Sequence, residues 1–140
     1  GYFQVLIRIV GSDAIPEFRL VAVTIIKGLV RGSWKPSRTS AVRVLSQQDK
    51  QTLREYLISE AAKNEADRRV AVQLSTLTSK VARNDWFREY PELFPGLFDF
   101  ILNEKDYHCR LRFLETLHLV LKELQTKKIG FSYDAFCKMV

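Results

Sequence analysis

The sequence predicts an all-α fold in which about three helical hairpins stack as an α-α superhelix. Apolar residues recur at helical spacing along most of the 140-residue chain, and only residues 3–10 allow an ambiguous strand reading. Apolar residues make up 46% and charged residues 27% of the chain, which is typical of a packed globular domain and excludes a disordered one.

The first clearly amphipathic helix is predicted from Ile15 to Val30, with Pro16 in its first turn. Its expected core-facing stripe consists of Phe18, Ala22, Ile25, Ile26 and Leu29. A basic loop from Ser33 to Val44 follows. Ser46, with Asp49 three positions later, predicts the cap of a second helix. That helix is expected to continue through Leu53, Tyr56, Leu57 and Ala61.

Three further helices and the start of a fourth are predicted beyond residue 63. Asn64 caps a helix that ends near Asp85, with the apolar stripe Val70, Leu74, Leu77 and Val81. Pro91 begins the next helix, which Pro95 either delays or kinks. Asp106 caps another helix, with the stripe Leu114, Leu117, Leu121 and Leu124 and a stop at Gly130; a last helix starts at Ser132.

Internal repetition distinguishes a closed bundle from a row of hairpins. Ile26 and Leu29 match Leu74 and Leu77 at a separation of 48 positions. Leu74, Leu77 and Val81 match Leu114, Leu117 and Leu121 at a separation of 40. These periods agree with the roughly 40 to 47 residues of HEAT and armadillo repeats, although any two leucine-striped helices can be aligned. The sequence therefore predicts a HEAT/armadillo-like solenoid.

The net charge limits the classes of possible partner but does not identify one. The net charge of +6 is compatible with an acidic protein, nucleic acid or a membrane surface. No run of about 18 apolar residues is present, so membrane insertion is not expected. The best nucleic-acid candidate is the loop with Lys35, Arg38 and Arg43, but an ordinary solvated loop is favoured there, and we expect no direct nucleic-acid binding.

Neither catalysis nor a cofactor is expected. His108 and His118 have only Cys109 near them, which is too few ligands for a closed metal site. No catalytic triad, zinc motif or phosphate-binding loop is present. Cys109 and Cys137 form no ligand cluster, which favours a reducing compartment.

The N-terminus suggests that the chain is a piece of something longer. It lacks a starting Met, and apolar residues begin at Tyr2. We therefore interpret residues 1–140 as a single HEAT-repeat segment of a longer protein.

Particular residue runs extend this interpretation. Phe18-Arg19-Leu20-Val21-Ala22 is followed by Lys27 and Trp34, and Lys80-Val81-Ala82-Arg83-Asn84-Asp85 precedes Tyr90-Pro91-Glu92-Leu93-Phe94-Pro95. Both runs resemble the N-terminal region of the importin-β (karyopherin) superfamily of nuclear transport receptors. Leu117, Leu121-Lys122-Glu123-Leu124, Lys127-Lys128 and Phe136 are similar to the next helix in the importin eleven branch. Tyr90 replaces a usual Trp, and Gly28 a usual Asn or His.

The resemblance implies a non-enzymatic receptor that shuttles between nucleus and cytoplasm, with Ran-GTP, protein cargo and, through the full-length receptor, nucleoporins as partners. The family's first hairpin would precede Gly1. In a row of hairpins the second helices line the groove, and the resemblance implies that this face contacts Ran-GTP. The candidate residues are Lys27, Arg31, Arg69, Gln73, Lys80 and Arg83. Thr24, Thr76, Arg112, Glu115 and Lys122 fit the same stripes.

Two alternatives remain open at this point. The charged stripes are ordinary solvated helix faces, or the chain is a HEAT scaffold that binds protein or RNA without a transport role. Trp34 and the run Tyr90-Pro91-Glu92-Leu93 are expected to be packed hairpin corners and not recognition motifs.

Overall fold

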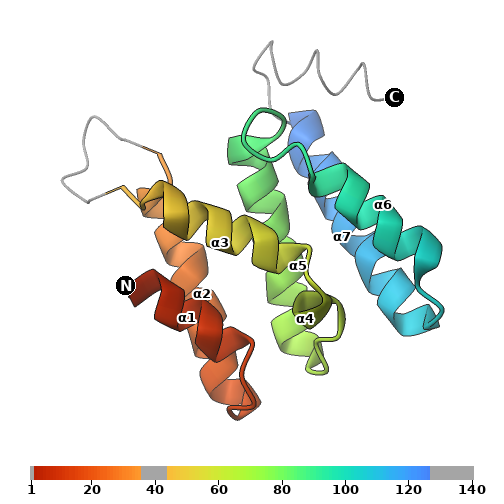
Figure 1. Ribbon diagram of the computed structural model, residues 1–140, viewed down its shortest axis with the longest axis horizontal. Coiled ribbons are helices and arrows are strands. Elements are labelled where there is room, and N and C mark those ends of the chain that lie inside the picture. Colours follow the sequence, from red (N-terminus) through yellow and green to blue (C-terminus); the bar gives the residue numbers. More distant parts are fainter. Residues whose placement is uncertain (1, 36–43, 127–140) are drawn as a thin grey trace. The chain divides into compact units, whose positions relative to one another are not determined.

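The computed structural model describes residues 2–35 and 44–126. In those ranges all regular secondary structure is helical (Figure 1). The helices are α1 (Tyr2–Val10), α2 (Pro16–Ser33), α3 (Gln47–Leu57), α4 (Glu60–Lys63), α5 (Arg68–Asp85), α6 (Leu93–Asn103) and α7 (Tyr107–Thr126). The predictions for Arg38, Arg43, Lys127, Lys128, Gly130, the helix from Ser132, Phe136 and Cys137 lie outside the described residues.

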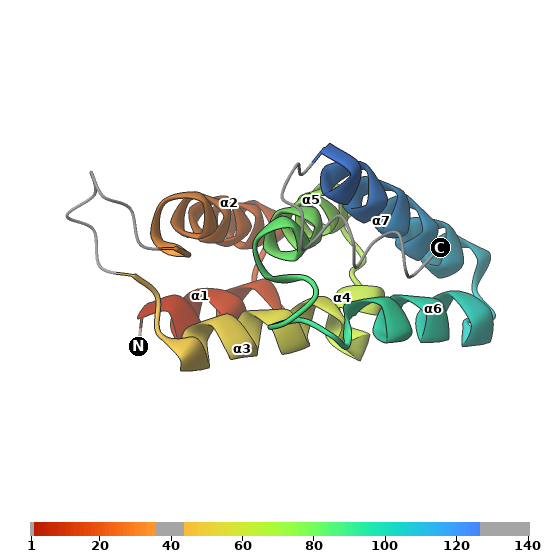
Figure 2. The same cartoon turned by 90° about the horizontal axis from the view of Figure 1, so that it is seen from above.

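The chain divides into two compact units, Gly1–Leu74 and Ser75–Val140. In the first unit α1 and α2 form a hairpin and α3 packs beside α1. Figure 2 shows α1 and α3 in one layer and α2 in the other. In the second unit α6 and α7 form a hairpin. This hairpin-based, all-helical architecture confirms the predicted α-α superhelix class, and residues 3–10 are helical.

Helix α2 begins at Pro16, as expected for a residue without an N–H at a position where that donor has no intrahelical partner. The buried residues of α2 are Ala22, Val23, Ile26, Val30 and Ser33. The predicted stripe is wrong in part, because Phe18 is 63% exposed and Ile25 and Leu29 are half-buried. The apolar arc of α2 is wider than the face that packs inside this unit.

Helix α3 starts where the cap predicts. The Ser46 hydroxyl accepts a hydrogen bond from the Asp49 N–H at 3.1 Å. The Asp49 carboxylate accepts from the Gln4 amide of α1 at 2.9 Å, which fixes α3 against α1. The helix is shorter than predicted, because Ser59 starts the separate helix α4 by accepting from the N–H of Ala62. Ala61 therefore lies on α4 and is exposed.

The start of α5 differs from the prediction, whereas the start of α6 is delayed past Pro91, which is one of the two predicted effects of Pro95. Asn64 follows α4 as its C-terminal cap, and Asp67 caps α5 by accepting from the N–H groups of Arg69 and Val70 at 2.9 and 3.1 Å. Helix α6 begins at Leu93, two residues after Pro91. Pro95 consequently lies in the first turn, where its missing N–H removes no intrahelical bond.

Helix α7 begins after Asp106, whose carboxylate accepts from the His108 N–H at 2.8 Å as predicted. Its buried residues are Phe113, Thr116, Val120 and Leu124. The predicted stripe is right for Leu124 but wrong for Leu114, which is 46% exposed, and Leu117 and Leu121 are half-buried. The 40-residue match of Leu74 to Leu114 therefore joins a buried leucine to an exposed one.

Two large aromatic residues, Trp34 and Tyr90, are packed in the interior, as predicted for residues at hairpin corners. Trp34 is 2% exposed and Tyr90 is fully buried. The Lys50 ammonium lies 5.6 Å from the centroid of the Trp34 ring, within cation–π distance. Both aromatic residues therefore stabilise the helix ends, which confirms the structural interpretation.

Candidate protein-binding interface

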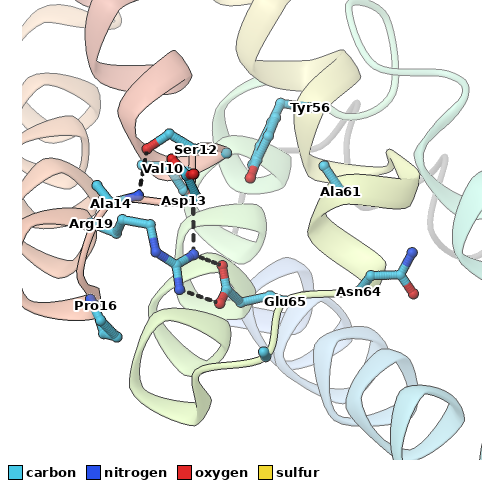
Figure 3. Close-up of a pocket in the computed structure, with 12 residues that line it drawn as sticks. Val10, Ser12, Asp13, Ala14, Pro16, Arg19, Tyr56, Ala61, Asn64 and Glu65 are labelled. Carbon is cyan, nitrogen blue, oxygen red and sulfur yellow. Dashed lines mark hydrogen bonds and ion pairs between the residues drawn. The ribbon is translucent and has the colours of Figure 1, made fainter.

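A buried ion pair ties α2 to the segment before α5 (Figure 3). The Arg19 guanidinium donates to both oxygens of Glu65, at 2.5 and 3.0 Å, and the side chains are 12% and 3% exposed. A third hydrogen bond runs from the Arg19 guanidinium to the Val10 carbonyl at 3.3 Å. Glu65 raises the pKa of Arg19, mainly through its hydrogen bond. The pair positions the two elements that carry Lys27 and Gln73.

The same pair lines a pocket of about 360 Å³. In Figure 3 the Tyr56 hydroxyl points into this space from α3. Burial raises the pKa of Tyr56 above its ordinary value. Gly11 opposes the ring, and a Cβ at Gly11 would lie 3.3 Å from the Tyr56 Cε2. Since the two most deeply buried charged groups here bind each other, the pocket's main role is structural.

Two predicted site residues are in contact in the first unit. The Lys27 ammonium on α2 donates to the Gln73 side-chain oxygen on α5 at 2.6 Å. An ammonium has three donors, so this contact leaves donor capacity for a partner. Arg31 lies on the same helix as Lys27 and is exposed.

Arg69 lies beside two carboxylates. Its Nη2 lies 3.4 Å from Glu17 and 3.3 Å from Asp67. The hydrogen bond to Asp67 is the main reason that the pKa of Arg69 is raised. The guanidinium is 55% exposed, but its charge is balanced locally, so Arg69 is the weakest of the cationic candidates.

Acid is expected to remove the stability that Asp67 contributes. The hydrogen bonds from Arg69 and Val70 favour the carboxylate and lower the pKa of Asp67. A lowered folded-state pKa means that this contribution is complete above about pH 4 and declines as the pH falls through the folded-state value. Asp67→Asn keeps an oxygen for the cap but carries no charge.

Urea unfolding at several pH values checks this prediction. Between about pH 5 and pH 2 the unfolding midpoint of Asp67→Asn should fall less than that of the wild type. Asp13→Asn, which removes an exposed carboxylate of the α1–α2 loop, is the control and should follow the wild type. Parallel curves for all three proteins would show that the cap carries no pH-dependent stability.

In the second unit Lys80 and Arg83 share one carboxylate. The Lys80 ammonium lies 2.5 Å from one oxygen of Glu123, and Arg83 Nη1 lies 3.3 Å from the other. Arg83 Nη1 also donates to the Thr126 hydroxyl at 3.0 Å. The Glu123 carboxylate therefore bridges the two cations. Lys80 and Arg83 are 50% and 42% exposed, which leaves both within reach of a partner.

The sequence also predicts that the chain has no metal site and no membrane-spanning helix. Within residues 2–35 and 44–126, no group of three or more His, Cys, Asp or Glu side chains could hold a metal ion. His108 and His118 are both exposed. None of the described helices combines the length and apolar character needed to cross a membrane.

Sequence reasoning missed the anions of these clusters. Glu17, Glu65 and Asp67 pair with cations of the first unit, and Glu123 pairs with Lys80 and Arg83. Most of these pairs join residues 40 to 52 positions apart. Helical spacing within one element gives no signal for such pairs; only the packing of neighbouring helices does.

Comparison with known proteins identifies the family. The sequence model of the importin-beta N-terminal domain matches residues 1–62, which include α1, α2 and α3. Importin-11 of Mus musculus and of Homo sapiens are each 33% identical to the chain over 137 residues, or 97% of its length. The chain belongs to the importin-β superfamily.

The residues that carry the family resemblance have clear structural roles. Arg19 of the first quoted run forms the buried pair with Glu65, Trp34 is buried, and Arg83 of the second run joins the Glu123 cluster.

The chain spans 13% of the length of the two importin-11 relatives. No solved structure shows a significant match to the chain.

Proposed function

We propose that this chain is a segment of a nuclear transport receptor and that it contributes to binding Ran-GTP. The observation that carries the proposal is the similarity to importin-11 over 97% of the chain. The length of these relatives supports the interpretation of residues 1–140 as one segment of a longer receptor. Cargo binding, nucleoporin binding and shuttling between nucleus and cytoplasm would belong to that receptor as a whole.

The exposed cations give this proposal a chemical basis. Lys80 and Arg83 are 50% and 42% exposed, so an acidic group of a partner can form charge-assisted hydrogen bonds with them. In the first unit Lys27 and Gln73 offer donors, and Arg31 is exposed. Arg69 contributes less, because two carboxylates already balance its charge.

Charge reversal at Lys80 and Arg83 together should weaken Ran-GTP binding. We expect Lys80→Glu with Arg83→Glu to cost about 1 to 3 kcal/mol, or about 5- to 150-fold in Kd, because like charges would face acidic groups of Ran. Equilibrium titration against Ran loaded with GTP and separately with GDP measures the effect. Binding selective for the GTP form supports the receptor function; equal binding of both forms favours the alternative of a scaffold without a transport role.

A matched control separates local contacts from net charge. Lys105→Glu with Arg110→Glu makes the same change of net charge at two exposed cations of the second unit that are not among the candidates. This control should retain most of the affinity. If a folded Lys80→Glu, Arg83→Glu protein binds Ran-GTP as the wild type does, these two residues are not part of the site.

A further inference from the structure

We infer that Lys80 and Arg83 form a seat for one carboxylate of a protein partner, and that Glu123 occupies this seat until the partner replaces it. The inference rests on the proposed function for the identity of the partner, but its chemistry is read from α5 and α7 alone. It makes Glu123 an internal competitor for the partner's acidic group.

The geometry of the cluster is that of a shared seat. The two oxygens of Glu123 face different cations, with Oε1 on Lys80 and Oε2 on Arg83. One carboxylate thus spans an ammonium and a guanidinium, 43 and 40 positions away in the chain. An incoming aspartate or glutamate can make the same pair of charge-assisted bonds.

Arg83 does not depend on the Glu123 carboxylate for its orientation. Its Nη1 also donates to the Thr126 hydroxyl at 3.0 Å and to the Glu123 backbone carbonyl at 3.3 Å. These two contacts persist when the carboxylate rotates away, so the guanidinium remains oriented. Lys80 is half exposed and its flexible stem can follow either carboxylate.

The exchange is energetically accessible. Both ion pairs lie at the surface, where such pairs contribute little to stability because water competes with them. Once displaced, the Glu123 carboxylate can be rehydrated, since its side chain is already 22% exposed. The internal pairs therefore weaken partner binding modestly without preventing it.

Glu123→Gln tests the inference, because it keeps the size of the side chain and removes the competing charge. We expect affinity for Ran-GTP to increase about 3- to 10-fold at low salt and the gain to shrink at high salt. Glu89→Gln is the control: it removes the same charge from an exposed position of the second unit that lies outside the candidate stripes. A gain of equal size in both variants would reflect net charge alone and overturn the inference.

A second probe separates this inference from the proposed function. A hexaglutamate peptide with blocked ends should also bind Glu123→Gln more tightly than the wild type, and the difference should vanish when Lys80→Met and Arg83→Met are added. If Ran-GTP binds neither protein but the peptide behaves in this way, the proposed function fails and the seat stands. If the wild type binds Ran-GTP and Glu123→Gln binds it equally or more weakly, the inference is wrong.

Discussion

Glu65→Leu is expected to destabilise the chain by about 3 to 5 kcal/mol, because it leaves the Arg19 guanidinium buried without its carboxylate. Glu65 is 3% exposed at its side chain and holds Arg19 through two hydrogen bonds. It also accepts from the N–H of Asp67 at 2.9 Å, so its loss loosens the cap of α5. Urea unfolding measures the change.

Two further variants make this prediction specific. Glu17→Gln breaks an ion pair whose side chains are 55% and 64% exposed, and it should cost less than about 0.5 kcal/mol. Arg19→Met combined with Glu65→Leu should recover much of the loss, since neither charge of this pair is then buried. The Arg19 Nε is buried without a hydrogen-bond partner in the described part of the chain, so the native pair is incompletely satisfied. A double variant as unstable as Glu65→Leu would contradict this account.

Trp34→Ala is expected to cost about 3 to 5 kcal/mol through the cavity that it leaves. Trp34 is 2% exposed at the end of α2 and lies under the Lys50 ammonium. The same unfolding experiment applies. Phe18→Ala, on the same helix but 63% exposed, should change stability by about 0.5 kcal/mol or less. If Phe18→Ala proves the more costly change, the assignment of Trp34 as the structural corner is wrong.

Helix starts and aromatic corners could be predicted wherever the signal is local. Ser46 and Asp106 were identifiable as caps because an N-terminal hydroxyl or carboxylate bonds an N–H two or three residues away. The prediction for Asn64 is wrong because Asn64 ends the short helix α4, whereas Asp67 caps α5. The helical spacing of the apolar residues gives no signal for a four-residue helix such as α4.

The sequence identifies the cations of the candidate interface, but it does not show which carboxylates lie beside them. The sequence predicts that Lys27 and Gln73 face the same groove, and the structure brings the two side chains into contact. Arg69 and Lys80 looked equivalent in the sequence. Their surroundings differ, because two carboxylates lie beside Arg69 whereas Lys80 shares one with Arg83.

The sequence by itself determined the all-α class, the approximate helix boundaries, the family resemblance and the positively charged character of the chain, because each depends on neighbouring residues or on composition. Tertiary structure decided which part of each apolar arc is buried and which anion each cation binds. Helix α7 shows the reason: its apolar arc includes Phe113, Leu114, Leu117 and Val120, and its own periodicity cannot select among them. Packing in the second unit buries Phe113 and Val120 and leaves Leu114 exposed.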